Sequence, residues 1–270
     1  MKNYAGPTDI MYHTGLSADM IRGAKYALVP GDPGRVEGLA KSLDENALFV
    51  ASHRDYTTWL AQVENAPVLV MSTGMGGPCV TFAVEELARL GVETFIRVGT
   101  TGSIQEDLHL GDVVINTASV RMDGASRAYA PIEFPAAADM DTVLALREAA
   151  EESGIPFKTG ISISTDSFWP GQERYDSFGG YVLKRLQGSL DDFRHLGCTN
   201  YEMENATLFT LCAVLGLKAA SICGVVAKRT DSESVAPHEV YEKAEQRFQD
   251  VVKRALKKMI ARSRSGGNIS

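Results

Sequence analysis

The sequence has no long apolar run. Nowhere does it approach the roughly eighteen consecutive apolar residues that a helix needs to cross a bilayer, and residues 1–15 lack the apolar stretch of a secretion signal. These absences predict that no membrane is a partner and that the protein is cytoplasmic.

Positive charge is also scarce. The chain has 27 lysines and arginines against 34 aspartates and glutamates, for a net charge of -7. A surface of this sign repels nucleic acid and anionic membranes, so we expect neither as a partner. Any arginine beside a glycine turn is therefore a local feature rather than part of a basic face.

Cysteine is limited to four residues, and none of them form a C-x-x-C pair. They are Cys79, Cys198, Cys212 and Cys223, and most of them stand in apolar segments. This pattern predicts buried free thiols rather than disulfides or a zinc site.

No internal repeat and no linker divides the chain, so we expect one domain over residues 1–270. Residues 1–20 form a polar lead-in, and the Gly- and Ser-rich tail at residues 263–270 is typical of a flexible terminus. A G-x-G-x-x-G that opens a helix, with an acidic residue about twenty residues later, is missing, which excludes a dinucleotide-binding Rossmann domain.

The chain does contain an alternation of strands and helices, and its 270 residues, 44% of them hydrophobic, can bury the core of one α/β domain. Residues 67–72 predict a strand, residues 80–90 a helix that Gly91 ends, and residues 94–98 another strand. That order predicts a βαβ unit with parallel strands. Further strands are expected at residues 26–29, 47–52, 57–63, 113–120, 161–167 and 219–227, and further helices at residues 140–153, 206–215 and 240–260.

Arg97 lies inside the apolar strand at residues 94–98, just before the turn Gly99-Thr100-Thr101-Gly102-Ser103. Arginine is rarely buried without a partner, so this one predicts an anion. The amides of a glycine turn and the threonine hydroxyls would converge on the same place and favour phosphate. For a lone arginine, an ion pair with a carboxylate would be the better interpretation.

Two further arginines follow strand ends, and together the three favour an anion site over a simple ion pair. Arg35 closes the turn at residues 30–35 and predicts a second anion-binding turn, since a purely structural turn would need the glycines and prolines but not the arginine. Arg54 follows the strand at residues 47–52 and is a weaker candidate, because exposed arginines in turns are common. The turn at residues 73–78 fits close ligand approach and close packing equally well.

A long polar insertion, residues 168–188, follows the strand at residues 161–167. Loops of this length beside α/β sheets commonly cover a site, and the aromatic residues argue against disorder. Gln172 offers an amide donor and acceptor and Arg174 a guanidinium fork, which suits a heterocycle with carbonyls and an N–H. An exposed polar loop is the alternative.

Two carboxylates, Glu202 and Glu204, precede the helix at residues 206–215. One of them could chelate the adjacent hydroxyls of a sugar. On the residues alone, a favourable interaction with the helix dipole is the better explanation.

Taken in order, these motifs resemble the nucleoside phosphorylase family, and in particular its uridine-cleaving members. The resemblance runs from about Tyr12 to the closing helix. The segments that carry it are Pro30-Gly31-Asp32-Pro33-Gly34-Arg35, Ser52-His53-Arg54, Ser72-Thr73-Gly74-Met75-Gly76-Gly77-Pro78, Arg97-Val98-Gly99-Thr100-Thr101-Gly102, Pro170-Gly171-Gln172-Glu173-Arg174-Tyr175 and Asn200-Tyr201-Glu202-Met203-Glu204.

The resemblance implies a three-layer α/β/α sandwich around a mixed, partly barrel-like sheet. It also implies a pentosyltransferase that performs the reversible phosphorolysis of uridine to uracil and ribose 1-phosphate in pyrimidine salvage. Inorganic phosphate would be a co-substrate, and no cofactor would be required. The protein would be a homo-oligomer, at least a dimer, with a hexamer as the larger alternative.

Residue roles are implied in the same way, with Arg97, Glu204 and Arg174 as the catalytic groups. The phosphate residues would be Gly31, Arg35, Arg97 and Thr100, together with Arg54 from a neighbouring subunit. The ribose residues would be Met203 and Glu204, together with His13, which would reach the 5'-hydroxyl across a dimer interface. The uracil residues would be Phe168, Gln172 and Arg174.

Two positions bear on specificity and metal binding. The purine-specific branch has a Ser-Asp pair after the last strand, where this chain has Ala227-Lys228. Bacterial relatives can hold a monovalent cation with a carboxylate and a serine, for which this chain has Asp55 and Cys79. A thiol is a poor ligand for a hard cation, so Asp55 alone is a weak metal candidate.

The alternatives within enzymes are a purine or broad-specificity nucleoside phosphorylase, or a nucleosidase that uses water. From another class, the chain could be a non-catalytic nucleoside-binding protein. Arginines at each of the expected phosphate positions argue against that reading, because a nucleoside sensor needs no phosphate site.

Overall fold

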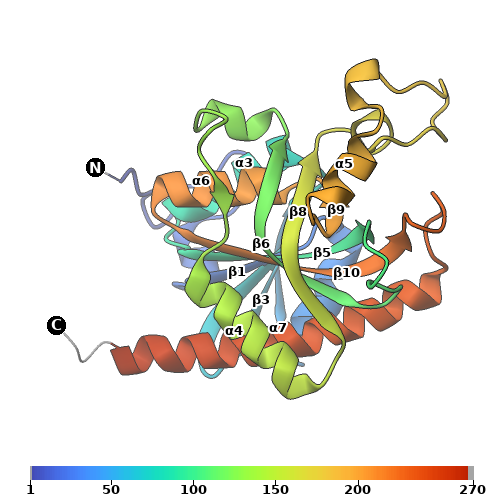
Figure 1. The fold of residues 1–270 in the computed structure, drawn as a ribbon. Helices are drawn as coiled ribbons and strands as arrows, with labels where there is room; N and C mark the ends of the chain where they lie inside the picture. The colour runs from blue at the N-terminus through green and yellow to red at the C-terminus, as the bar shows by residue number, and fades with distance from the viewer. Residues whose placement is uncertain (1, 267–270) are drawn as a thin grey trace.

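A ten-stranded mixed sheet forms the centre of the molecule in the computed structural model, which describes residues 2–266 (Figure 1). The strands are β1 (Tyr26–Val29), β2 (Leu48–His53), β3 (Tyr56–Val63), β4 (Ala66–Met71), β5 (Thr94–Ser103), β6 (Val113–Met122), β7 (Ala136–Ala137), β8 (Phe157–Thr165), β9 (Asn200–Glu202) and β10 (Lys218–Lys228). The helices are α1 (Ala18–Ile21), α2 (Val36–Leu43), α3 (Gly77–Arg89), α4 (Met140–Ser153), α5 (Ser189–His195), α6 (Asn205–Leu215) and α7 (His238–Gly266).

Part of this sheet closes on itself. Along the order β10-β6-β8-β9-β5 each strand pairs with the next, and β10 also pairs with β5, so these strands form a barrel. Four strands extend from β5 as an open wing in the order β1-β4-β3-β2, and the short β7 pairs with β6. The prediction of a mixed, partly barrel-like sheet is therefore confirmed.

The expected βαβ unit consists of β4, α3 and β5. Both strands run parallel to β1, which lies between them and pairs Tyr26 with Val68 on one side and with Thr94 on the other. Pro78 stands in the first turn of α3, where its missing amide hydrogen costs no helical hydrogen bond. Gly91 follows the helix with φ 102°, a backbone conformation that favours glycine.

Two hydrophobic clusters separate the layers. One lies beneath α2, α4 and α7 and includes Leu39, Leu146 and Val252. The other lies beneath α1, α3 and α6 and includes Val84 and Phe209. Helices thus cover both sides of the sheet, as the three-layer prediction requires. Every residue from Asn205 to Cys212 is buried, as expected of a helix that is apolar on all sides.

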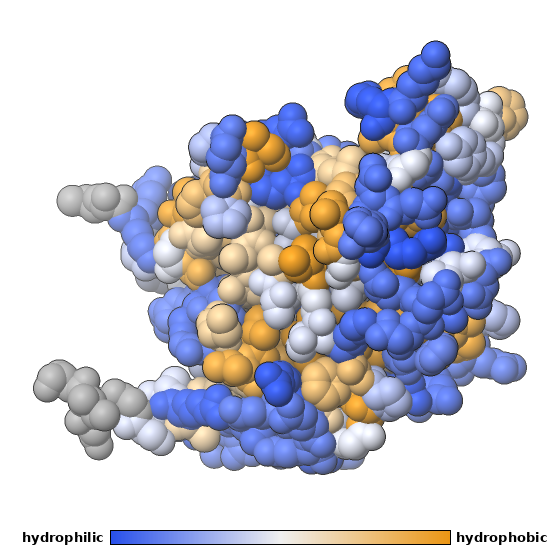
Figure 2. Space-filling view, viewed as in Figure 1, coloured by the Kyte–Doolittle hydropathy of each residue, from blue (hydrophilic) through white to orange (hydrophobic). Residues whose placement is uncertain are grey.

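The C-terminal end differs from the prediction. Residues 263–266 were expected in a flexible tail, but they belong to α7 (His238–Gly266). Side chains at this end are tied down: Arg262 pairs with Glu148 at 2.6 Å, and the Arg264 guanidinium donates to the Glu64 carbonyl at 2.6 Å. Figure 2 shows the exposed face of α7 as a hydrophilic band along the bottom of the molecule. The rest of the predicted tail, residues 267–270, lies outside the described residues.

The prediction of buried free thiols is confirmed for three of the four cysteines. All four cysteines are free; Cys198, Cys212 and Cys223 are buried, and Cys79 is partly buried. Among residues 2–266, no helix combines the length and apolar content that a membrane span requires.

Close packing of α7 on the barrel gives a stability test. A Cβ at Gly224 of β10 would lie 2.6 Å from the Cβ of Ala244 on α7. Gly224→Ala is therefore expected to lower the free energy of unfolding by about 1–3 kcal/mol. Gly38 of α2 has no atom within 4 Å of a Cβ, so Gly38→Ala should instead raise it by up to about 1 kcal/mol. Urea denaturation of both variants measures the two changes, and a harmless Gly224→Ala would contradict this packing.

Candidate functional site

Arg97 is buried on β5, close to the ends of β1 and β4. The last residue of β1, Val29, pairs with Arg97, so the turn that follows β1 begins level with this arginine. The guanidinium lies across Gly99, where a Cβ would be 3.0 Å from Nη2. The turn after β4 reaches the same place, because the Gly74 amide donates to the Gly31 carbonyl at 3.0 Å. Gly31 is thus placed beside the Arg97 strand, as the sequence predicts.

Two carboxylates approach Arg97 from the end of β9. Nη2 of Arg97 pairs with Oε2 of Glu204, and Nε lies 3.8 Å from Oε2 of Glu202. Burial by itself lowers the pKa of Arg97, but the charge of Glu204, with a smaller contribution from Glu202, outweighs it and raises that pKa. Arg97 therefore stays charged, and the ion pair considered for a lone arginine is present.

The ion pair with Glu204 uses only one of the three guanidinium nitrogens of Arg97. Its Nε and Nη1 atoms are buried and have no hydrogen-bond partner among the described residues. Buried donors of a charged group are costly when they are left without an acceptor. Arg97 therefore retains the capacity to bind an anion while it stays paired with Glu204.

The two carboxylates differ in their surroundings. Glu202 accepts from the amides of Glu204 and Asn205, each at 2.7 Å, and from the Ser162 and Ser164 hydroxyls. Burial raises the pKa of Glu202; Arg97 opposes that rise and Glu204 adds to it. The hydrogen bonds of Glu202 thus fix the start of α6. This is a structural role, as the sequence analysis considered for the two carboxylates before this helix.

Glu204 is held differently. Its Oε1 accepts from the Gly76 amide at 2.8 Å, and its Oε2 accepts from the Met203 amide at 3.2 Å and from Arg97. No helix amide is among these donors. Glu204 therefore links the glycine turn before α3 to Arg97, and Met203 lies directly beside it.

The three residues predicted to hold the base lie together. Gln172 and Arg174 are 3% and 2% exposed, so neither belongs to the exposed polar loop considered as an alternative. The Arg174 guanidinium lies 4.2 Å from the ring centre of Phe168, and its Nε has no hydrogen-bond partner among the described residues. Between them, Glu173 has φ 53°, and this left-handed turn lets both neighbours point inward.

Arg229, which the sequence analysis missed, fixes this loop. It directly follows β10, donates from Nη1 to the Gln172 carbonyl at 2.5 Å and is itself only 4% exposed. Glu233 pairs with both arginines, at 3.0 Å from Arg174 and 2.8 Å from Arg229. Burial lowers the pKa of Arg174, and the charge of Arg229 lowers it further. Arg174 and Arg229, two neighbouring cations that share the single carboxylate of Glu233, therefore favour a further negative charge beside them.

A second residue that sequence reasoning passed over is Glu173 itself. Its carboxylate accepts from the amides of Gly188 and Leu190 at the start of α5, the latter at 2.7 Å. The insertion thus ends in a helix that is capped by the residue between Gln172 and Arg174. No local pattern indicates this contact, because capping residues are sought just before a helix and not in a loop well upstream of it.

Arg35 and Thr100 were also predicted to bind phosphate. Arg35 ends the turn η1 (Pro33–Arg35) with its Nε paired to Glu245 of α7 and its guanidinium 5.3 Å from the Phe248 ring centre. It would have to use its remaining nitrogens, or leave Glu245, to join Arg97. Thr100 is partly exposed.

His13 and Arg54 form a separate group. The His13 carbonyl lies 2.9 Å from Nδ1 of His53, and the Arg54 guanidinium lies 5.1 Å from the Tyr12 ring centre. His13 is held on α3 at Phe82 and Glu86, six and ten residues beyond Gly76. At 1.5 Å per residue, those contacts lie about 9 and 15 Å along the helix from the glycine that binds Glu204. The structure does not bring His13 into the Arg97 group of its own subunit.

The candidate metal residue, Asp55, stands in the turn next to Arg54. A Cβ at Gly74 would lie 3.3 Å from Asp55 Cβ and 3.4 Å from Cys79 Sγ, so both side chains flank the same glycine. Among the described residues, no group of three or more His, Cys, Asp or Glu side chains is suited to a metal ion.

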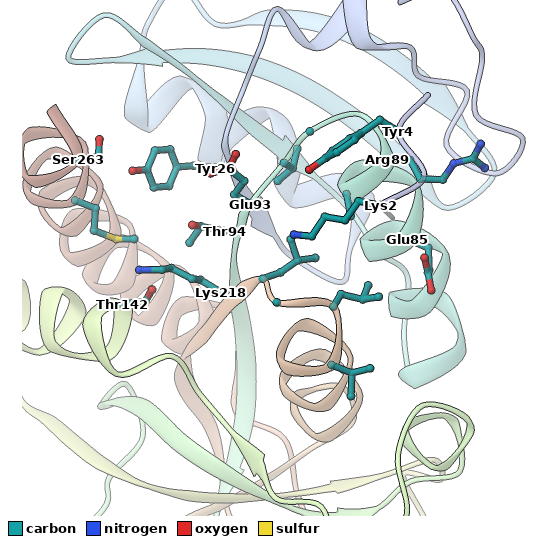
Figure 3. A pocket seen from close by; sticks show the side chains of 18 of the residues that line it. Lys2, Tyr4, Tyr26, Glu85, Arg89, Glu93, Thr94, Thr142, Lys218 and Ser263 are labelled. Atoms are coloured by element: carbon teal, nitrogen blue, oxygen red, sulfur yellow. The ribbon is translucent and has the colours of Figure 1, made fainter. Parts of the chain in front are cut away.

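A cavity of about 1250 Å³ lies at the other end of the strands (Figure 3). It is lined by Tyr26, Thr94 and Lys218, which begin β1, β5 and β10, and by Tyr4 and Arg89. None of the predicted site residues lines it. It mixes charges of both signs, with Lys218 paired to Asp141 at 3.4 Å.

Several known sequences are similar to this chain. The sequence profile described as the Phosphorylase superfamily matches residues 25–257. The uridine phosphorylase of Escherichia coli (strain K12) is 50% identical over 223 residues, which are 83% of this chain and 88% of the relative. The uridine phosphorylase of Thermococcus kodakarensis is 46% identical over 210 residues, 78% of this chain and 75% of the relative. The guanosine phosphorylase of Halorubrum lacusprofundi is 37% identical over 201 residues, 74% of this chain and 77% of the relative.

The contacts of Arg229 predict a mobility change in the loop that carries Gln172. Arg229→Lys keeps the charge but removes the planar fork that reaches both the Gln172 carbonyl and Glu233. We expect amide hydrogen exchange over residues 168–176 to become at least about tenfold faster, the result of losing roughly 1.4 kcal/mol of local stability. Arg247→Lys is the matched control, because Arg247 also donates to a carbonyl, that of Gly111, but far along the chain from this loop. Equal exchange in both variants would contradict the role of Arg229.

Proposed function

Since the chain belongs to the phosphorylase superfamily, we propose that it catalyses the reversible phosphorolysis of uridine to uracil and ribose 1-phosphate in pyrimidine salvage. It is a pentosyltransferase, and inorganic phosphate is its co-substrate. The observation that carries this function is the buried Arg97, whose Nε and Nη1 have no hydrogen-bond partner among the described residues while Nη2 holds Glu204.

The phosphate and ribose roles follow from that pair. Phosphate binds Arg97, the Gly31 turn and Thr100, and Arg35 joins it from the neighbouring turn. Glu204 accepts hydrogen bonds from the 2'- and 3'-hydroxyls of the ribose, beside Met203. Because Glu204 and the phosphate share one guanidinium, the nucleophile and the sugar carbon that it attacks are positioned relative to each other.

The base lies between Phe168, Gln172 and Arg174. Gln172 offers both a donor and an acceptor to the uracil edge, and Arg174 has an unused Nε. As the glycosidic bond breaks, negative charge moves onto the two carbonyls of uracil. The paired cations Arg174 and Arg229 stabilise that charge in a site from which water is largely excluded.

This chemistry needs neither a covalent intermediate nor a redox cofactor. Phosphate is an adequate nucleophile, and uracil leaves as a delocalised anion. Catalysis then consists of positioning and electrostatic stabilisation: Arg97 fixes the phosphate, Glu204 anchors the ribose as it gains oxocarbenium character, and Arg174 receives the leaving group. We assign no metal ion to the site, because the thiol of Cys79 stands beside Asp55.

Specificity for pyrimidines is supported at the end of β10. The position where purine-specific relatives place an acid is occupied by Ala227-Lys228, and the nearby Asp231 lies 3.6 Å from the Lys228 amino group. The likeness to a guanosine phosphorylase keeps purine nucleosides as the alternative substrates.

We also propose that the enzyme works as a homo-oligomer of at least two subunits in the cytoplasm. His13 lies apart from the Arg97 group of its own chain, so it serves a second subunit at the ribose 5'-hydroxyl, and Arg54, which contacts the neighbouring Tyr12, serves the phosphate of that subunit. A single subunit then has an incomplete site.

One assay separates the candidate activities. Purified protein is incubated with uridine in the presence and absence of phosphate, and base release is followed by absorbance; inosine is run in parallel. We expect uridine to be cleaved only with phosphate and faster than inosine. Cleavage without phosphate would identify a nucleosidase, preference for inosine a purine enzyme, and no cleavage of either a non-catalytic protein.

Removal of the central cation gives the second test. Arg97→Ala is expected to lower kcat/KM for phosphorolysis by on the order of 10² or more, as loss of one preorganised charge-stabilising donor typically does. Arg89→Ala, at the exposed end of α3 beside the distant cavity, is the control and should leave kcat/KM unchanged. Near wild-type phosphorolysis by Arg97→Ala would remove this residue from the site.

A further inference from the structure

A buried carboxylate on α3 has no assigned role in the proposed reaction. Glu86 is 7% exposed, and every hydrogen bond that it accepts comes from His13 or Thr14. The backbone amides of these residues lie 2.9 and 2.8 Å from its two oxygens, and Nδ1 of His13 lies 2.7 Å from Oε1. Among the described residues, Glu86 has no ion pair with a lysine or an arginine.

This arrangement determines which nitrogen of His13 carries the proton. Burial raises the pKa of Glu86, but the hydrogen bonds from His13 and Thr14 outweigh burial and hold the pKa below its ordinary value. Glu86 is therefore ionised near neutral pH and can only accept hydrogen bonds. Nδ1 of His13 must then be the donor, and in the neutral ring Nε2 presents a lone pair.

The ring of His13 is also fixed in orientation. It stacks on Phe82 with 4.1 Å between ring centres and an angle of 20°, and Tyr12 meets it edge-on at 5.0 Å. Its side chain remains 28% exposed, although Glu86 is nearly enclosed. The imidazole is thus held by a carboxylate and by aromatic neighbours. A ring held in this way can present Nε2 to a ligand.

We propose that Glu86 is a positioning residue that locks His13 in the Nδ1–H tautomer, so that Nε2 accepts a hydrogen bond from the ribose 5'-hydroxyl of a nucleoside held by a second copy of this chain. This inference rests on the proposed function. The primary hydroxyl is the donor in this contact, which sets the direction of the hydrogen bond. Neither Glu86 nor the tautomer follows from the motifs in the sequence.

The test compares uridine with 5'-deoxyuridine, which lacks only the 5'-hydroxyl. Wild-type protein is expected to prefer uridine in kcat/KM by about tenfold, the effect of one hydrogen bond. In Glu86→Gln the negative charge that favours a proton on Nδ1 is lost, and in either orientation the new NH₂ group opposes an N–H donor, that of Thr14 or those of His13, so the ring is no longer held in one tautomer and position. The preference should fall close to one in Glu86→Gln, in His13→Ala and in the double variant, because both residues act through the same contact.

Glu85→Gln is the matched control, since Glu85 neighbours Glu86 on α3 and makes none of these contacts; it should retain the wild-type preference. Circular dichroism and Tm values verify that each variant is folded. An independent measurement on the wild-type protein is the ¹⁵N spectrum of the His13 ring, which should show the Nδ1–H tautomer at a pH where the ring is neutral.

The outcomes separate the two proposals. If wild-type protein cleaves uridine and Glu86→Gln keeps the full preference, or if the ring shows Nε2–H, the role of Glu86 is overturned while the proposed function stands. If His13→Ala alone keeps the preference, His13 does not contact the 5'-hydroxyl. If wild-type protein does not cleave uridine at all, the proposed function falls, and this inference with it.

Discussion

The buried charge of Arg97 is the constraint on which the rest of the site depends. A guanidinium that is 7% exposed in the wall of a barrel must have an anionic partner. Glu204 supplies one from the start of α6, and the same carboxylate takes the Gly76 amide at 2.8 Å. Because Glu204 can satisfy only part of the fork, the fold leaves donors that a second anion can use.

The neighbouring carboxylates show how one short segment performs two tasks. Glu202 is fully engaged by backbone amides and serine hydroxyls, so it fixes the backbone from β9 into α6 and is not available to a ligand. Glu204, two residues later, receives no helix amide and faces Arg97. Because Glu202 holds this backbone, Glu204 is left available for the ribose-binding role that we propose.

The sequence was sufficient for eight of the ten strands and for the four longest helices, because these depend on local apolar patterns and on glycine turns. It did not indicate the short strands β7 and β9 or the shorter helices α1, α2 and α5. It was not sufficient for contacts between distant segments. Glu86 meets His13 across 73 residues, and Arg229 meets the Gln172 carbonyl across 57 residues. The direction of Arg35, which turns toward Glu245, is likewise set by the packing of α7 and not by its own turn. The extension of α7 to Gly266 depends on side-chain contacts of the same long-range kind.

The position of His13 is the structural basis for our proposal that two subunits share a site. The lead-in is tied to α3 by Glu86, which cannot release it without leaving a buried carboxylate without donors, and such a loss is costly. His13 is therefore unable to travel back along the helix to the Glu204 end of its own subunit. A histidine that is rigid, oriented and partly exposed, yet remote from its own pocket, can serve a nucleoside only if another subunit brings that nucleoside to it. The tautomer and the partner subunit that we propose are thus two consequences of the same buried carboxylate.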